Sequence, residues 1–278
     1  MGSSPILPTK LLNYEIGYRF KSYRRRTQRL FQSRKLNKKM KQIIIGDIHG
    51  HDSWKRIIDQ EKTFDRIVFL GDYHDSFKIS SKSIVDNFKS IVELKNSLKD
   101  KVVLLCGNHD YHYIEGIDSK FSGYRPELKG MQKEMLLELI QNDTIQLCFK
   151  DEENRLYSHA GISRTWLKNL NKNISIENID KELNNLFKNS LGLFNFIYGK
   201  SYNYYGDDPE NGPLWIRPNS LYYDAISEYD QIVGHTQPQY PLVIKSNQKT
   251  NIYLADTLKF GYYIVSNEVS IGFKQIKI

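Results

Sequence analysis

Three short polar segments of the chain carry side chains that can bind metal ions. They are Gly46-Asp47-Ile48-His49-Gly50, Gly71-Asp72-Tyr73-His74-Asp75 and Gly107-Asn108-His109-Asp110. Carboxylate, imidazole and amide groups suit borderline divalent metals, and the chain has no set of cysteines for a structural zinc site. The candidate site residues in these segments are Asp47, His49, Asp72, Asp75, Asn108 and His109.

Two further histidines extend this set. His159 follows the apolar segment 155–157, and His235 follows the apolar segment 231–233. The ligand-type side chains are then too many for a single ion. Two ions about 3.5–4 Å apart that share one carboxylate would use them, and such a pair can acidify a water molecule and hold a phosphoryl oxygen.

The polar segments follow runs that read as buried β-strands. Residues 41–45, 67–70 and 102–106 are rich in large apolar side chains, and a glycine follows each run. Ligands bind at the carboxyl ends of the strands in open α/β sheets, so we expect the polar side chains to converge there. Residues 53–60 and 80–98 predict helices between these strands, which indicates a βαβ pattern.

The remaining chain predicts further strands and helices. Helices are predicted over 126–140, 176–196 and 223–228, and strands over 145–149, 155–157, 231–233 and 251–254. A closing hairpin is predicted over 260–265 and 269–276, and a polar, tyrosine-rich insertion over 195–212. The helix over 126–140 should bury Leu128, Met131, Met135, Leu136 and Ile140.

The positive charge is concentrated at the start of the chain. The 278 residues carry a net charge of +8. Residues 1–41 hold twelve lysines and arginines against one glutamate, so this segment carries +11 and residues 42–278 carry −3. We therefore expect a basic extension over 1–39 and one domain over 40–278. The extension reads either as a solvated tail or as a patch that binds nucleic acid or another anionic surface.

Composition also bears on location. The chain has no apolar run of about 18 residues, so no membrane span is expected, and no secretion signal is recognised. Cys106 and Cys148 lie in apolar runs and read as reduced core residues. These features favour a cytoplasmic protein.

The five strand-end segments, taken in order, resemble the calcineurin-like metallophosphoesterase superfamily. The similarity is greatest to the phosphoprotein phosphatase branch, which includes bacterial and phage serine/threonine phosphatases and symmetrical diadenosine-tetraphosphate hydrolases. It covers the chain from about Met40 to the C-terminus. The resemblance implies a four-layer α/β/β/α sandwich with two mixed sheets. It also implies two divalent ions, with Mn²⁺ as the first choice and Fe, Zn, Ni or Co as alternatives.

The resemblance assigns a role to each metal ligand. Asp47 and His49 would hold the first ion, and Asp72 would bridge both ions. The second ion would be held by Asn108, His159 and His235. His51, His74 and His112 match no ligand position, so they are expected beside the site or on the surface.

The resemblance also names catalytic residues and one departure. His109 would protonate the leaving oxygen, and Asp75 would orient its imidazole. The branch usually has an arginine directly after this aspartate to bind substrate phosphate, whereas this chain has Ser76, which cannot replace a bidentate guanidinium. Arg217, in Pro213-Leu214-Trp215-Ile216-Arg217, would then supply most of the phosphate binding. Asp256 is a candidate partner for a ligand histidine.

These roles predict a dinuclear metal-dependent phosphoester hydrolase. The favoured substrate is phosphoserine or phosphothreonine in a protein. The alternatives are a dinucleoside polyphosphate, or a phosphodiester cleaved by a nuclease whose basic extension binds nucleic acid. Ser76 leaves the preference between monoester and diester open.

Overall fold

The computed structural model describes residues 40–115, 122–198 and 206–277. The basic extension over 1–39 and part of the tyrosine-rich insertion, residues 199–205, lie outside the described residues. Within the described part of the chain, no helix has both the length and the apolar character needed to cross a bilayer.

The first sheet is built around a parallel core. Among the described residues it contains six strands, in the order β11 (Ile271–Gln275), β10 (Tyr262–Ser266), β1 (Gln42–Ile45), β2 (Arg66–Phe69), β3 (Val102–Leu105) and β4 (Ile145–Gln146). Strands β1 to β4 run parallel to one another, and the β10–β11 hairpin is antiparallel to β1. The sequence predicted both the parallel unit and the closing hairpin, and both predictions are confirmed.

The second sheet has the same plan on a smaller scale. Its five described strands lie in the order β5 (Cys148–Lys150), β6 (Arg155–Ser158), β7 (Asp230–Val233), β9 (Asn251–Leu254) and β8 (Leu242–Lys245). The central strands β6, β7 and β9 are parallel, and the two edge strands are antiparallel to their neighbours. Each sheet is therefore mixed, with four adjacent parallel strands in the first and three in the second.

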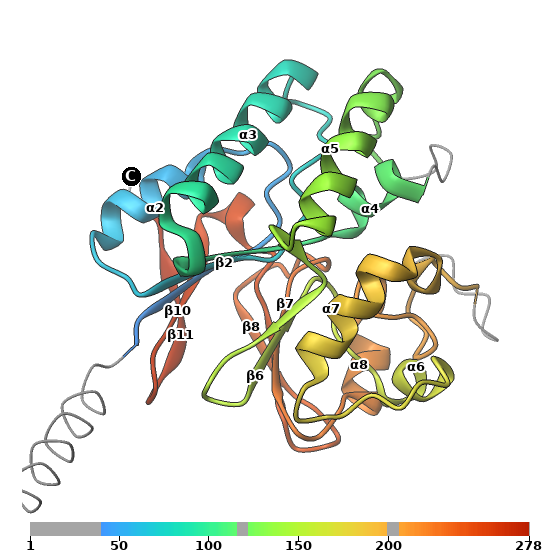
Figure 1. The fold of residues 1–278 in the computed structure, drawn as a ribbon. Helices are drawn as coiled ribbons and strands as arrows, with labels where there is room; N and C mark the ends of the chain where they lie inside the picture. Colours follow the sequence, from blue (N-terminus) through green and yellow to red (C-terminus); the bar gives the residue numbers. More distant parts are fainter. Residues whose placement is uncertain (1–39, 116–121, 199–205, 278) are drawn as a thin grey trace, which may run out of the picture. The chain divides into compact units, whose positions relative to one another are not determined.

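The helices cover the outer faces of the two sheets (Figure 1). Their bounds are α2 Ser53–Glu61, α3 Ser81–Leu98, α4 Asn108–Glu115, α5 Lys129–Gln141, α6 Arg164–Asn169, α7 Ile179–Asn189 and α8 Pro218–Asp224. Short 3₁₀ turns occupy Lys99–Lys101, Pro126–Leu128, Leu191–Phe194 and Leu258–Phe260. Helices α2, α3 and α5 pack on the first sheet, and α7 and α8 pack on the second.

Alternation along the strands separates the layers. On β1, Ile43 and Ile45 pack toward the helices, whereas Ile44 packs between the sheets. The same alternation holds along β2 and β3, and the cluster between the sheets contains Ile44, Val68, Leu70, Val103, Leu105, Tyr157, Ile232 and Tyr253. A two-residue side-chain period on strands buried on both faces produces this arrangement. The expected four-layer α/β/β/α sandwich is confirmed.

One predicted strand is two strands that belong to different sheets. The run 145–149 breaks at Leu147, so that β4 ends the first sheet and β5 begins the second. Asn184 of α7 stabilises the break, because its side-chain oxygen accepts hydrogen bonds from the backbone N–H groups of Leu147 and Cys148 at 2.9 and 3.1 Å. A side chain 36 residues farther along thus supplies the partner that a continuous strand would have found in its own sheet.

Other boundaries also differ from the sequence predictions. The helix predicted over 223–228 is wrong, because the chain forms α8 earlier, with Pro218 at the start, where its fixed φ favours a first helical turn. Helix α7 is shorter than the predicted 176–196. In α5, Met131 is about half exposed and Gln132 is buried in its place. Strand β8 was missed because its side chains are largely exposed and show no apolar alternation.

Candidate metal centre

The predicted ligands lie at the carboxyl ends of the parallel strands. Asp47, Asp72 and Asn108 follow β1, β2 and β3 of the first sheet. His159 and His235 follow β6 and β7 of the second sheet. The two sheets pack face to face, so these strand ends meet at one edge of the sandwich. The site therefore spans both sheets.

The first group of ligands contains Asp47, His49 and Asp72. Their ligand atoms all lie within 4.8 Å of one another. The His49 Nε2 atom is 3.7 Å from Asp72 Oδ2, and the other ring nitrogen, Nδ1, lies 2.9 and 3.0 Å from the carbonyl oxygens of His74 and Asp75. Because Nδ1 donates to a carbonyl, Nε2 is left with the lone pair that a metal needs.

The second group contains Asn108, His159 and His235. The Asn108 Oδ1 atom is 2.8 Å from His159 Nε2 and 2.9 Å from His235 Nδ1. Asp72 joins the two groups, since its Oδ2 atom is 3.4 Å from His159 Nε2. Asp72 therefore lies between the two groups, within 3.7 Å of a histidine nitrogen in each.

Backbone carbonyls fix the orientation of the histidines. His159 Nδ1 lies 2.9 Å from the carbonyl oxygen of Leu70, and His235 Nε2 lies 3.1 Å from that of Trp215. The Asp256 carboxylate accepts a hydrogen bond from the Gln237 side chain and interacts electrostatically with His49. Carbonyl partners cannot be recognised in a sequence, since every residue has one.

Two glycines leave room for the carboxylates. A Cβ atom at Gly107 would lie 2.1 Å from Asp72 Oδ1, and a Cβ atom at Gly234 would lie 2.1 Å from Asp47 Oδ1. Both contacts are far inside van der Waals distance. Gly107 and Gly234 are therefore required by the close approach of a carboxylate from another strand end.

The backbone of the site is strained. His49, Asp72, Asp75 and His235 have φ values of 42°, 52°, 63° and 61°, in the left-handed region that non-glycine residues avoid. Such conformations cost about 1–3 kcal/mol each and persist only where the surrounding structure holds them. Four of them at one site indicate that the side-chain positions were selected at the expense of backbone stability.

The site concentrates negative charge away from water. Burial raises the pKa of Asp72 to about 8. Burial and the nearby carboxylates of Asp256 and Asp72 raise the pKa of Asp47 well above its usual range. Burial also lowers the pKa of His159 to about 3, which keeps this imidazole neutral and able to bind a metal. Crowded carboxylates beside neutral imidazoles fit divalent cations, whose charge would make the ionised carboxylates favourable.

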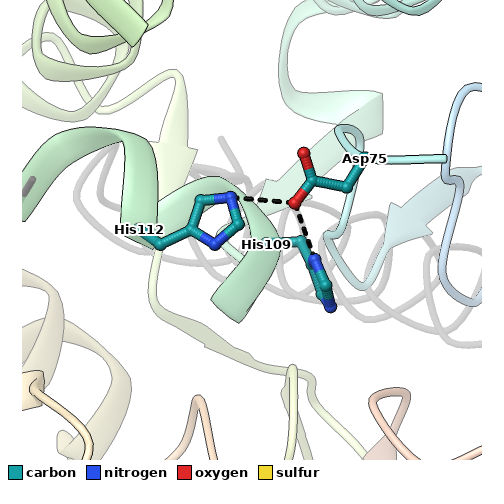
Figure 2. A group of neighbouring side chains, drawn as sticks. All are labelled: Asp75, His109 and His112. Carbon is teal, nitrogen blue, oxygen red and sulfur yellow. Dashed lines mark hydrogen bonds and ion pairs between the residues drawn. The ribbon is translucent and has the colours of Figure 1, made fainter. Parts of the chain in front are cut away.

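A histidine–carboxylate pair lies beside the ligands. The His109 Nδ1 atom is 2.8 Å from Asp75 Oδ2 (Figure 2). The backbone N–H of His109 donates to Asp72 Oδ1 at 2.8 Å. The His109 and His49 rings lie 5.1 Å apart, edge to face. His109 is therefore held between the carboxylates of Asp72 and Asp75.

A second histidine–carboxylate pair was missed in the sequence. His74 is fully buried, with Nδ1 2.6 Å from Asp110 Oδ1 and Nε2 2.8 Å from Gln132 Oε1. Asp110 also accepts hydrogen bonds from the backbone N–H groups of Gly107 and Tyr73, both at 2.9 Å. This network joins the loops that carry Asp72 and Asn108. The only available sequence signal was a histidine two residues after a ligand aspartate.

Arg217, Arg125 and Lys78 are basic residues that lie in three different environments. Arg217 is partly buried and donates to Thr236 Oγ1 at 3.1 Å, beside His235. Arg125 donates to the carbonyl oxygens of Ser76 and Ile79 at 2.6 and 2.9 Å, so its guanidinium holds the loop after Asp75. Lys78 is exposed on that loop, and His51 is also exposed.

Comparison with known proteins identifies the family. The sequence pattern of the calcineurin-like phosphoesterase family matches residues 40–244, so the chain belongs to this family. Its relatives include symmetrical bis(5'-nucleosyl)-tetraphosphatases from two strains of Buchnera aphidicola subsp. Acyrthosiphon pisum, Tuc7 and 5A, at 30% and 32% identity over 149 residues. The matched region covers 51% of this chain and 52% of each relative, so the chain spans about half the length of these curated relatives.

Solved structures agree on the fold. The cold-active protein-tyrosine phosphatase of the psychrophile Shewanella sp. superposes with a TM-score of 0.58 at 16% sequence identity. The match covers 86% of this chain and 80% of that chain. At this identity the likeness concerns the fold alone.

Proposed function

We propose that this chain hydrolyses phosphoesters with two divalent metal ions, and that its substrate is phosphoserine or phosphothreonine in a protein. The observation that carries the proposal is the meeting of ligand side chains from both sheets around Asp72, beside a histidine held by a carboxylate. Two bound ions would supply a nucleophilic water at neutral pH and balance charge on the phosphoryl group. Mn²⁺ is the ion we expect first, with Fe, Zn, Ni or Co as alternatives.

The distances support the proposed ligand roles. Asp47 and His49 would hold one ion, and Asp72 would be shared. The other ion would be held by the amide oxygen of Asn108 and by the two imidazoles beside it, those of His159 and His235. Amide oxygen, imidazole nitrogen and carboxylate together suit ions of borderline softness.

His109 is the proposed general acid. Its Nδ1–H donates to Asp75, which leaves Nε2 to carry the proton for the leaving oxygen. A water oxygen bonds to phosphorus as the P–O bond to the leaving group breaks, and the Nε2 proton passes to the departing alkoxide. The products are inorganic phosphate, an alcohol and a neutral imidazole that still donates to Asp75. General acid catalysis of this kind contributes roughly 10²–10⁴-fold to the rate.

Arg217 is the proposed phosphate-binding residue. Its hydrogen bond to Thr236 fixes the guanidinium next to the ligand His235. Ser76 cannot provide a second guanidinium, and Arg125 is engaged with backbone carbonyls. Phosphate recognition would thus depend on one arginine together with the metal ions, which predicts a modest affinity for the phosphate group alone.

The segments around Gln237 and Asp256 support a place in the phosphoprotein phosphatase branch. Gln237 follows His235 by two residues, and this pattern resembles the phosphoprotein phosphatase branch. In the structure, Gln237 donates a hydrogen bond to Asp256, so the two segments that carry the resemblance meet beside the site.

A second candidate substrate is a dinucleoside tetraphosphate. The observation that favours it is the 30–32% identity to symmetrical bis(5'-nucleosyl)-tetraphosphatases over half of this chain. The same metal centre and acid would serve that reaction, with a nucleotide as the leaving group.

One panel of substrates tests both candidates. The full chain with Mn²⁺ is assayed on para-nitrophenyl phosphate, its bis-ester, a phosphoserine peptide, a phosphotyrosine peptide and diadenosine tetraphosphate, with the chelated protein as control. Phosphoserine hydrolysis at the highest kcat/KM supports the first candidate, and preference for diadenosine tetraphosphate supports the second. Release of no product from any substrate, by protein that contains two ions per chain, would refute the proposed function.

A further inference from the structure

The carboxylate of Asp75 has more side-chain contacts than a pair with His109 requires. His109 Nδ1 and His112 Nε2 both lie 2.8 Å from the same oxygen, Oδ2 (Figure 2). The hydroxyl of Tyr113 donates to the other oxygen, Oδ1, at 2.6 Å. Two ring nitrogens and one hydroxyl therefore converge on one buried carboxylate.

Helix geometry brings these donors together. His109, His112 and Tyr113 belong to α4, in positions i, i+3 and i+4, which lie on one face of a helix. Asp75 lies opposite this face, in the loop after β2. The sequence His-x-x-His-Tyr at the start of a helix is thus a local pattern for three donors aimed at a single acceptor.

The surroundings of the cluster restrict its motion. His112 and Asp75 are buried, and the Tyr124 ring stacks on Tyr113 at 5.1 Å and meets His112 edge to face at 5.0 Å. The backbone N–H of Arg125 donates to the Tyr113 hydroxyl at 3.1 Å. The hydrogen bonds from His109 and His112 outweigh burial and hold the pKa of Asp75 below its usual range. Asp75 is therefore an ionised carboxylate that cannot rotate freely.

The spacing of Asp75, His109 and His112 also resembles a metal site, since their ligand atoms lie within 4.8 Å of one another. The hydrogen-bonded arrangement argues against this role. The His109 Nδ1 atom, 2.8 Å from the acceptor Asp75 Oδ2, carries a hydrogen as a donor, and a nitrogen that carries a hydrogen has no lone pair for a metal.

We infer that His112 and Tyr113 are positioning residues for the acid His109, acting through Asp75. The inference rests on the proposed function, because it refines the role of His109 in the same site. His112 fixes the oxygen that accepts the His109 Nδ1–H, and Tyr113 fixes the other oxygen. Together they hold the His109 ring in one tautomer, with Nε2 directed away from Asp75.

A positioned acid matters most when the leaving group is poor. Para-nitrophenolate leaves with little help from a proton, whereas phenolate and serine alkoxide need one. Loss of the positioning residues should therefore reduce kcat for phenyl phosphate and a phosphoserine peptide more than for para-nitrophenyl phosphate. Damage to the fold or to the metal centre would reduce all three alike.

The test uses three variants of the full chain. His112→Phe removes the nitrogen that contacts Asp75 and keeps an aromatic ring against Tyr124, and His112→Gln restores a polar N–H near the position of Nε2. Tyr113→Phe removes the hydroxyl that donates to Oδ1. The matched control is Tyr111→Phe in the same helix, since the Tyr111 hydroxyl lies 2.8 Å from both Leu191 O and Asn195 Oδ1.

With Mn²⁺ bound, His112→Phe should lower kcat for phenyl phosphate by about 10–100-fold. KM and the two ions per chain should stay unchanged. His112→Gln should recover most of this loss, and Tyr111→Phe should match the wild type. Equal losses on good and poor leaving groups, or no difference between His112→Phe and His112→Gln, would overturn the inference.

A measurement without substrate separates this inference from the proposed function. In ¹⁵N-histidine-labelled protein loaded with diamagnetic Zn²⁺, the His109 Nδ1–H bonded to Asp75 should give a low-field proton resonance. The resonance should broaden or vanish in His112→Phe and return in His112→Gln. A resonance unchanged in His112→Phe refutes the positioning role, whatever the substrate panel shows.

Discussion

Replacing Gly107 by alanine should remove metal binding while the rest of the fold survives. The added Cβ would lie 2.1 Å from Asp72 Oδ1 and 2.3 Å from the Asp72 backbone nitrogen. To reach the 3.0 Å that real Cβ contacts keep, Oδ1 must move by about 0.9 Å. Metal–ligand distances tolerate only about 0.2 Å, and a misplacement of about 1 Å can cost about 10²-fold in rate. We therefore expect metal affinity and kcat to fall by at least about a hundredfold.

The assay is metal content after dialysis against Mn²⁺, followed by kcat for para-nitrophenyl phosphate and thermal unfolding. Gly130→Ala is the matched control, because a Cβ there, in α5, meets no atom within 4 Å. The control should keep both ions and gain about 0.5–1 kcal/mol of stability from the loss of a flexible glycine. If Gly107→Ala binds two ions and turns over normally, then Asp72 is not the shared ligand.

Four further outcomes follow from other parts of the molecule. His109→Asn should keep both ions but lower kcat by roughly 10²–10⁴-fold, so normal turnover would exclude it as the acid. Arg217→Lys should raise KM about tenfold for a phosphomonoester and affect kcat less, because a single point charge replaces the planar guanidinium that donates to Thr236. An unchanged KM would show that the metals alone bind the phosphate. Glu61→Gln should cost roughly 1–3 kcal/mol in urea unfolding at pH 7, because Glu61 forms ion pairs with Lys41 and Lys274. Burial raises the pKa of Glu61, but hydrogen bonds from these lysines and Tyr263 outweigh it and lower the pKa from 4.5 to about 2. The stabilisation by Glu61 is therefore complete above pH 4.5 and is lost as the pH falls through 2. The stabilities of wild type and variant should converge in acid, and parallel stability curves would contradict this. Chelation of the metals should abolish turnover and lower the unfolding temperature, with both restored by Mn²⁺, whereas full activity in the chelated protein would refute a metal-dependent reaction.

The sequence predicted the strand ends well because two local signals coincide there. An apolar run followed by glycine and a ligand-type residue marks the end of a strand. The glycine is needed there because a carboxylate approaches closely, as Asp72 approaches Gly107. Helix α3 was also predicted closely, since its apolar stripe is regular and Ser80 caps its start. Such features depend on neighbouring residues, so a single sequence contains them.

The parts that were missed depend on distant partners. The break at Leu147 needs Asn184 from α7, and nothing in the run 145–149 announces it. The buried His74 needs Gln132 of α5 as a hydrogen-bond partner. The sequence pattern predicts Met131, not Gln132, on the buried face of that helix. The sequence predicts His112 either beside the site or on the surface and does not distinguish between the two positions. Its contact with Asp75 becomes visible only when β2 and α4 are placed side by side.

The division of the ligands between the two sheets has a mechanical consequence. Asp72 and Asn108 extend from one sheet and His159 and His235 from the other, across an apolar interface of isoleucine, valine and leucine side chains. Such an interface resists separation but offers little resistance to sliding, because its contacts are not directional. Cations held by both sheets would cross-link the sheets at one end of this interface. Hydrogen exchange of the backbone amides in β6 and β7 should therefore slow when the ions bind.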